Sequence, residues 1–206
     1  MPDDSDANGR GLWSELREAY HCYLTHTFTL ELPQHSRIAY LKARGERSAK
    51  IWFGMAFVPV ALFRIRNQLL RRNVPLLPYF CDMLSTALWH VSIGRHVTAG
   101  EGLLFPHGHV VVDGVVNIGR NCVINPWVTI GLSNSRNLGF SLYGPTIGDG
   151  VQIGTGAKVL GPITVGDNAR IGANAVVIED VPAGATVVGA PARIVHTSQP
   201  VWRRSD

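Results

Sequence analysis

Large aliphatic residues recur at every sixth position through the second half of the chain. Two sets share this interval and are separated by one interruption: Val112, Ile118, Ile124 and Ile130, then Ile147, Ile153, Val159, Val165, Ile171 and Val177. A six-residue unit forms a short strand and a tight turn, which is too small to bury its apolar side alone. The period therefore predicts a solenoid of stacked units.

A second inward position is expected four residues after each of these aliphatic residues. It holds smaller or branched residues: Val116, Cys122, Val128, Val151, Ala157, Ile163, Ala169 and Ala175. Glycine often follows the large residue, and Asp-Gly, Asp-Asn and Ala-Asn pairs stand at turn positions that tolerate positive φ. Cys122 thus fills an inward position and needs no redox role.

The period is interrupted between Ile130 and Ile147. These residues are 17 positions apart instead of six, so about 11 residues must loop out of the solenoid, at about 132–145. Long loops in a compact fold often carry function. Ahead of Val112, the apolar positions slip by one residue after Phe105, and His107 falls within this slip.

The first part of the chain has a different composition, with longer apolar and basic segments of helical character. The apolar stretch Ile51 to Phe63 has 13 residues, short of the ~20 that span a bilayer, and predicts a buried helix. Helices are expected at Leu12 to Leu24 and Ala61 to Leu70, punctuated by Pro59, Pro75 and Pro78. The chain then divides into a helical region 1–90, a β-helical domain 91–195 and a tail 196–206.

Composition narrows the class further. Charged residues are 17% of the 206 residues and the net charge is +4, which does not indicate nucleic-acid binding. Three unpatterned cysteines and an acidic N-terminus without an apolar signal region favour a reducing, cytoplasmic location. A peripheral membrane contact through the basic stretch Arg64 to Arg72 stays open beside a solvated helix face.

The segment from about Ile93 to Val195 resembles the hexapeptide-repeat acyltransferases. It carries SIGRHVTAGEGLLFPHGHVVV, VTIG, IGDGVQIGTGAKVLGPITVGDNARIGANAVVIEDVP and VVGAPARIV in the order of the serine acetyltransferase branch. The resemblance implies a left-handed parallel β-helix, a homotrimer that could pair into a dimer of trimers, and acetyl-CoA bound between subunits.

His107, in FPHG, matches the family's catalytic histidine. It would remove the proton of the acceptor hydroxyl, which is a poor nucleophile while protonated. The family's acid that orients this histidine aligns with Ser92, so Glu101 or Asp113 is considered as a replacement.

The acceptor pocket departs from the serine enzymes. Their serine-binding Asp is Pro106 here, and their Arg-His-Pro reads Tyr143, Gly144, Pro145. An unpaired substrate carboxylate is costly to desolvate. The ALFRIRNQLLRRNVPLL lead-in and the pattern around His107 look like the colanic-acid and capsule-type O-acetyltransferases. We therefore expect transfer of acetyl to a sugar of a surface polysaccharide.

Acceptor-binding candidates are the aromatic residues in or beside the loop, Trp127, Phe140 and Tyr143, and His109, which would share a strand face with His107. Carried over from the family, the residues lining CoA are Gly131, Ser133, Thr155 and Ala173, with Arg170 and Arg193 for its phosphates.

Three other functions are weighed. A zinc site from His90, His96 and His109 is set aside, because no coordinating set recurs at the spacing of the coils. Serine O-acetyltransferase is the main alternative to the sugar enzyme. A catalytically idle oligomeric scaffold is the alternative from another class, and loss of thioester cleavage in His107→Ala would exclude it.

Overall fold

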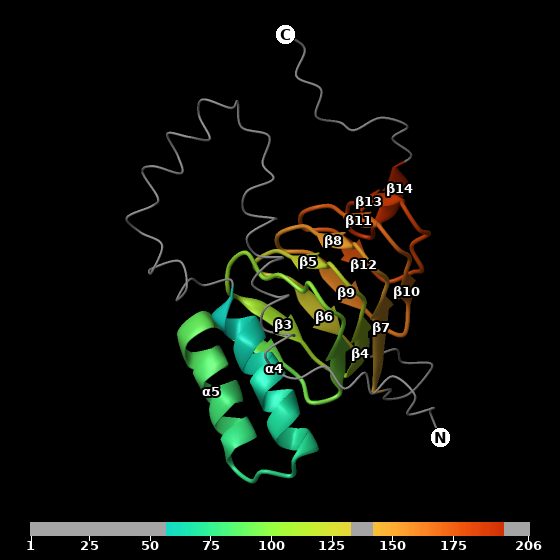
Figure 1. The fold of residues 1–206 in the computed structure, drawn as a ribbon. Helices are drawn as coiled ribbons and strands as arrows, with labels where there is room; N and C mark the ends of the chain where they lie inside the picture. The colour runs from blue at the N-terminus through green and yellow to red at the C-terminus, as the bar shows by residue number, and fades with distance from the viewer. Residues whose placement is uncertain (1–56, 133–141, 196–206) are drawn as a thin grey trace, which may run out of the picture.

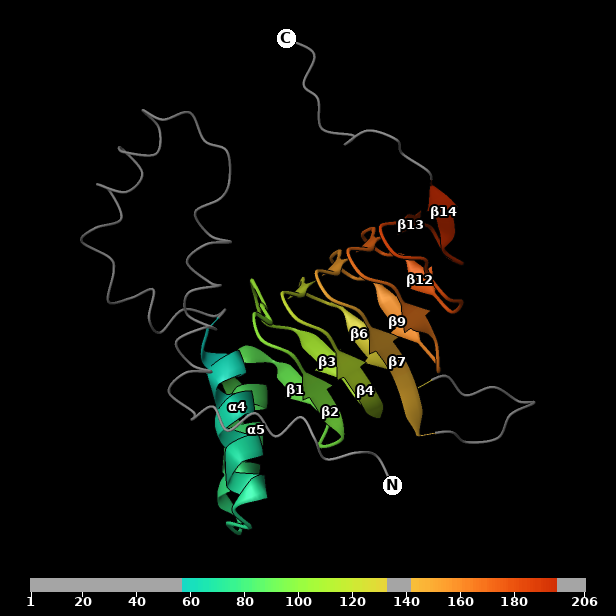
Figure 2. The same cartoon turned by 45° about the vertical axis from the view of Figure 1, so that its right-hand side comes forward.

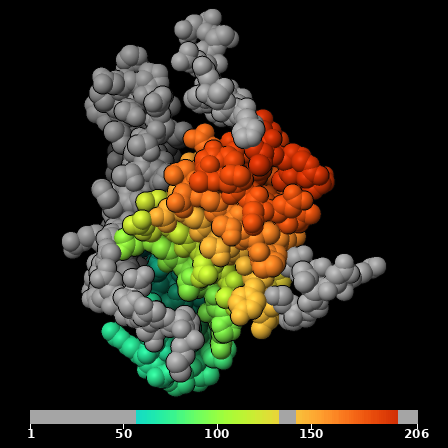
Figure 3. Space-filling view, turned by 90° about the vertical axis from the view of Figure 1, so that its right-hand side faces the viewer, coloured from blue at the N-terminus to red at the C-terminus, as the bar shows by residue number. Residues whose placement is uncertain are grey.

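The computed structural model describes residues 57–132 and 142–195. In these ranges two helices are followed by short strands that wind into a parallel β-helix (Figure 1). The helices are α4 (Val58–Arg71) and α5 (Leu77–Trp89), which pack against each other at the start of the solenoid. Successive coils then stack along one direction (Figure 2), and the space-filling view shows them as bands from green to red (Figure 3).

Three sheets form the faces of the solenoid. The first contains β1 (Val91–Ile93), β3 (Val110–Val112), β6 (Thr129–Gly131), β9 (Lys158–Leu160) and β12 (Val176–Val177). The second contains β2 (Val97–Ala99), β4 (Val115–Ile118), β7 (Tyr143–Ile147) and β10 (Thr164–Val165). The third contains β5 (Val123–Ile124), β8 (Gln152–Ile153), β11 (Arg170–Ile171), β13 (Thr186–Val188) and β14 (Arg193–Val195). Neighbours are parallel except β13 and β14, which pair antiparallel.

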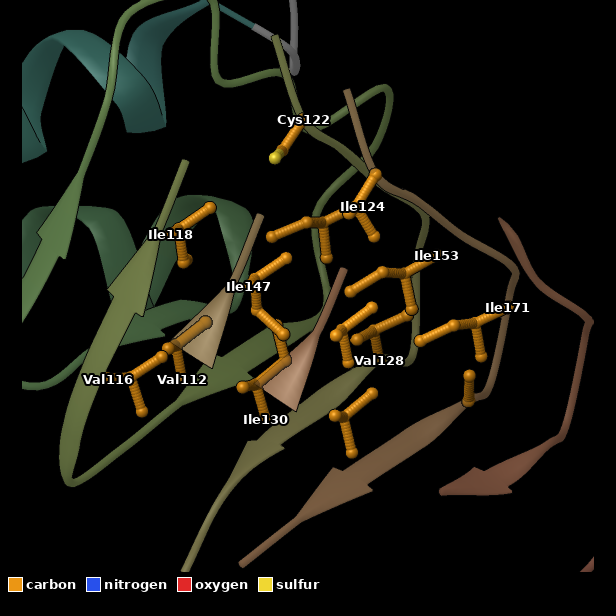
Figure 4. Close-up of a cluster of buried hydrophobic side chains, with 14 of the residues drawn as sticks. Val112, Val116, Ile118, Cys122, Ile124, Val128, Ile130, Ile147, Ile153 and Ile171 are labelled. Carbon is orange, nitrogen blue, oxygen red and sulfur yellow. The ribbon is translucent and has the colours of Figure 1, made fainter. Parts of the chain in front are cut away.

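The interior confirms both sets of inward positions predicted from the six-residue period. All ten large aliphatic residues are at most 5% exposed, and all eight smaller ones at most 8%. Figure 4 draws part of this set, and its labelled side chains point inward from the faces of the coils into one continuous core. Cys122 is fully buried among them, as expected.

The strand register measures the length of each coil. Val111 pairs with Thr129 and Ile153 with Ile171, so each of these coils consists of three six-residue units. Ile130 pairs with Val159, and this coil exceeds three units by the excess that the interrupted period predicted. The strand β7 begins at Tyr143, so the last residues of the expected loop belong to a strand instead.

The helices begin at prolines that the sequence had suggested only as interruptions. Pro59 and Pro78 each stand in the first turn of α4 and α5, where a missing N–H costs nothing. The predicted helix Ala61 to Leu70 is confirmed within α4, whereas α5 was not predicted. No helix of the described ranges is long and apolar enough to cross a membrane.

The basic stretch of α4 is mostly engaged in the fold. Arg64 donates to the carbonyl oxygens of Ala99 (2.7 Å) and Gly100. Arg66, 1% exposed, donates to those of Ile93 (2.5 Å) and Gly94 (3.2 Å). These carbonyls end the strands of the first coil, and the described residues place no further coil beneath it. Two residues of the basic surface expected from sequence therefore serve as a cap, and only Arg71 and Arg72 are exposed.

Candidate active site

Five of the predicted site residues lie along one corner of the solenoid, where the chain passes from the third sheet to the first. We call it the His107 corner; its segments in successive coils are 105–109, 125–128, 154–157 and 172–175. It brings together the acceptor and catalytic candidates of the lower coils with the CoA candidates of the upper coils: His107, His109, Trp127, Thr155 and Ala173.

His107 lies on an extra residue at this corner. Leu104 pairs with Val123, 19 positions on, whereas Val111 pairs with Thr129, 18 positions on. One residue more is thus accommodated between Leu104 and Val111 than in the next coil. This bulge is the slip seen in the sequence, and it places His107 on a bend with an exposed side chain.

Gly108 fixes this bend against the end of α5. A Cβ at Gly108 would lie 1.8 Å from the carbonyl oxygen of Trp89, and His109 N donates to that same oxygen at 3.1 Å. Only glycine fits so close to a backbone oxygen. The C-terminus of α5 therefore sets the path of the chain beside His107.

His107 and His109 do not share a strand face, contrary to the prediction, because the bend separates them and β3 begins only at Val110. Within the described residues His107 makes no side-chain hydrogen bond or ion pair. Neither proposed orienting acid reaches it. Asp113 Oδ1 instead accepts a hydrogen bond from Gly114 N at 2.9 Å, inside its own turn.

His109 is the middle member of a stack of three rings. Its centroid lies 4.7 Å from that of His90 and 4.1 Å from that of Trp127, with interplanar angles of 8° and 12°. The backbone ladder runs alongside, since Trp127 N donates to His109 O at 2.7 Å. We call His90, His109 and Trp127 the ring column. Trp127 forms the upper end of the ring column and is 58% exposed.

The other predicted residues lie elsewhere. Gly131 and Tyr143 flank the corner between the first and second sheets, and Tyr143 is 67% exposed. Arg170 begins β11 and is exposed. Ser133 and Phe140 lie outside the described residues.

Arg193 borders a surface hollow at the last coils. Glu179 and Asp180 line the same hollow, so its charge is mixed. Arg193 Nη1 donates to Ala192 O at 3.0 Å. The hollow is remote in sequence and in coil from His107 and gives no evidence of an acceptor pocket.

Ionisable groups with shifted pKa values lie away from the His107 corner. Burial raises the pKa of the Cys122 thiol to about 11. Hydrogen bonds from Arg120 lower the pKa of Asp149, with Arg120 Nη2 2.7 Å from Asp149 Oδ2. Both groups serve the solenoid and its turns, not the candidate site.

His90, His96 and His109, the histidines weighed for zinc, are not gathered into a metal centre. The described residues contain no group of three His, Cys, Asp or Glu side chains able to hold an ion. His90 and His109 do recur one coil apart, but their rings are stacked face to face. The ring nitrogens of two stacked imidazoles point in parallel directions and do not converge on one metal ion.

Sequence reasoning missed two contributors to this corner. His90 was considered only as a metal ligand, and Gly108 was not considered. The signal for the ring column was present, because His90, His109 and Trp127 follow one another at intervals of one full coil. Aromatic residues at the full coil period predict stacking.

Comparison with known proteins places this fold and corner in a family. Residues 144–179 match the model for the bacterial transferase hexapeptide with six repeats. The serine acetyltransferase of Helicobacter pylori is 37% identical over 134 residues, which cover 65% of this chain and 77% of that protein. The chain therefore belongs to the hexapeptide-repeat acyltransferase family.

The solved structures agree, and those that superpose on this chain include serine acetyltransferases. That of Neisseria gonorrhoeae superposes with a TM-score of 0.73 and 28% identity over 95% of this chain and 70% of that one. A serine acetyltransferase in complex with CoA gives 0.59 and 34%, covering 68% and 56%. The expected left-handed β-helix with preceding helices is thereby confirmed. The chain spans 57 to 64% of the length of the first curated relatives it matches.

These relatives correct the acceptor expected from sequence. Curated and solved relatives at 28 to 39% identity are serine acetyltransferases, so the expected colanic-acid branch and polysaccharide acceptor are wrong. The prediction was wrong because it relied on three substituted serine-binding positions, Pro106, Tyr143 and Gly144, more than on the similarity of the whole coil region. The expected class, an O-acetyltransferase, agrees with the relatives.

Proposed function

We propose that this protein is a serine O-acetyltransferase that uses acetyl-CoA, with His107 as its general base. The observation that carries the proposal is the 34 to 39% identity to serine acetyltransferases over 69 to 72% of this chain. The placement of His107 on an exposed bend, held by Gly108 against α5, supports its assignment.

The chemistry follows from one proton transfer. His107 takes the proton of the serine hydroxyl as the oxygen attacks the thioester carbon, and a tetrahedral oxyanion forms. The C–S bond then breaks, CoA leaves as the thiol with the proton returned by the imidazolium, and O-acetylserine is released. A positioned base contributes about 10² to 10⁴ in rate.

The CoA arm would run up the His107 corner. Thr155 and Ala173 are exposed there in the two coils above Trp127, and small side chains allow the backbone to approach a ligand. Gly131 and Ser133, and Arg170 and Arg193 for the phosphates, complete the proposed CoA contacts. Because His107 has no orienting partner within the described residues of its own chain, we propose a homotrimer in which a neighbouring subunit supplies it. The proposed location is the cytoplasm.

The test is acetyl transfer by the purified full chain. Acetyl-CoA and L-serine should give free CoA thiol and O-acetylserine in equal amounts, measured by thiol titration and mass spectrometry. His107→Ala should lower kcat by about 10² to 10⁴ with the trimer intact. Absence of thioester cleavage by the wild type would exclude the activity. Unchanged cleavage by His107→Ala would remove His107 from the mechanism.

A further inference from the structure

The ring column occupies backbone positions that disfavour its residues. His90, His109 and Trp127 have φ of 54°, 64° and 66°, in the left-handed region. Large side chains there are strained by about 1 to 2 kcal/mol per residue. The C-cap of α5 and the two coils stacked on it carry this strain in one column.

The same chain shows what is normally placed in such turns. The corner between the second and third sheets uses only Gly or Asn at its left-handed positions: Gly102, Asn121, Gly150, Asn168 and Gly184. The two coils above Trp127 also return to Gly156 and Asn174. Aromatic residues are therefore confined to the lower coils of the His107 corner, which associates them with the site and not with the turn.

The column ends in an open aromatic face. The next coil places Gly156 over Trp127, with Gly156 N donating to Pro126 O at 2.9 Å, and glycine offers no ring to continue the stack. Above Gly156 is the carboxamide of Asn174, whose Oδ1 would lie 2.1 Å from a Cβ at position 156. Asn174 Oδ1 thus takes the place that a side chain at position 156 would occupy, and the indole beyond it stays open to solvent, since Trp127 is 58% exposed. Figure 2 shows the order of these coils through β6, β9 and β12.

Trp127 is held in place by His109 beneath its ring and by a hydrogen bond to its backbone. His109 covers one face of the indole at 4.1 Å, and Lys158 Nζ donates to Trp127 O at 2.7 Å. A ring that His109 covers on one face and that is still 58% exposed is a preformed platform for a planar group.

We infer that the free face of Trp127 is a stacking subsite for an amide of the CoA arm, which it positions beside His107; this inference rests on the proposed function. Trp127 lies one coil, ~4.8 Å, above the coil of His109 and His107. The first amide of the arm lies only two methylene groups from the thioester sulfur, whereas the adenine is at the far end. The only planar group of serine is its carboxylate, whose charge the negative face of an indole disfavours.

The experiment compares ligand binding to the full chain by calorimetry. The probes are CoA and adenosine 3′,5′-bisphosphate, which has the adenine and phosphates but no arm. Trp127→Ala should weaken CoA binding about three- to tenfold and leave adenosine 3′,5′-bisphosphate unchanged, while Trp127→Phe retains most of the CoA affinity. Tyr79→Ala is the matched control, because Tyr79 is equally exposed, at 58%, on α5.

Trp127→Asn separates a ligand role from a structural one. Asparagine is the residue this chain uses at left-handed turns, so the variant should melt at or above the wild-type Tm while losing CoA affinity as Trp127→Ala does.

Four results would overturn the inference. For Trp127→Ala, they are equal weakening of the binding of both probes, unchanged CoA binding, or a change of oligomeric state in size-exclusion chromatography. For Trp127→Asn, the result is a lowered Tm with unchanged CoA binding. A wild type that binds no CoA would instead overturn the proposed function.

Discussion

Arg66 Nη1 lies 2.5 Å from the carbonyl oxygen of Ile93, the last residue of β1, and 3.0 Å from Asp82 Oδ1 of α5. The guanidinium thus joins α4, α5 and the first coil. Inside the solenoid, the equivalent carbonyl at the end of a strand accepts from the preceding coil, as Val112 O does from Gly94 N at 2.7 Å. No coil precedes β1 within the described residues, so the Arg66 guanidinium takes the place of that N–H donor.

Replacing Arg66 should therefore loosen the lower end of the solenoid. Arg66→Met keeps most of the buried aliphatic stem but leaves the carbonyls of Ile93 and Gly94 without their donor. We expect a loss of about 2 to 4 kcal/mol in the free energy of unfolding. Denaturant melts followed by circular dichroism measure it, with exposed Arg71→Met as the control. Equal midpoints for the two variants would contradict the capping role.

Gly108→Ala should damage activity more than binding. The new Cβ would meet the Trp89 carbonyl oxygen at 1.8 Å, so the bend carrying His107 must shift. A displacement of about 1 Å can cost on the order of 100-fold in rate. We expect that loss in kcat, with KM for acetyl-CoA changed much less. Gly131→Ala is the control for folding, because a Cβ at Gly131 would lie 3.4 Å from its nearest neighbour, the carbonyl oxygen of Asp113. This variant should melt like the wild type. Wild-type kcat in Gly108→Ala would exclude the proposed placement.

Cys122 should make stability depend on alkaline pH. The folded thiol has a pKa of about 11, above its ordinary value of 9.0. Between these values the unfolded chain loses the thiol proton while the folded chain keeps it, so stability falls as pH rises from about 9 to 11. Cys122→Ala removes this contribution, and its denaturation midpoint should fall less over that range. Parallel pH dependence in both proteins would show that Cys122 does not contribute.

Alkylation gives an independent measurement on the same thiol. At pH 8 in the folded protein Cys122 should resist iodoacetamide, because the thiol is fully buried and protonated. The unfolded protein should react. Peptide mass spectrometry identifies the modified residue, and rapid labelling of folded Cys122 would disprove its burial.

The departures from the family's serine-binding residues predict weak discrimination by the substrate carboxylate. Pro106, Tyr143 and Gly144 occupy the positions that resemble the family's serine clamp, and an Arg–carboxylate pair is worth about 1.5 to 3 kcal/mol. We expect kcat/KM for L-serine to exceed that for L-serinamide by less than about tenfold. A preference above a hundredfold would mean that another cation holds the carboxylate.

The sequence predicted the core because a solenoid repeats one local rule. Ile153 and Ala157 are buried for the same reason as Ile171 and Ala175, so spacing alone locates them. The extra residues in the interrupted coil could be counted for the same reason. The period also located the bulge at His107, since a single additional residue shifts everything that follows.

The remaining features depend on contacts that no local rule encodes. Arg64 and Arg66 look like surface charges until the first coil is placed beside them. Gly108 resembles any turn glycine until the end of α5 approaches it. The ring column needed the period of a full coil instead of the six-residue one. The acceptor was misjudged because absent clamp residues do not identify a replacement substrate.

The interrupted coil shows how this architecture tolerates change. After the additional residues between β6 and β7, the pairing resumes in step at Ile147 with Ile118 and at Val159 with Ile130. Each coil contacts only its neighbours, and lengthening a loop adds little closure entropy. The corner between β6 and β7 is therefore a position where segments of different length and chemistry can be exchanged, by evolution or by design, while the hydrophobic interior keeps its composition.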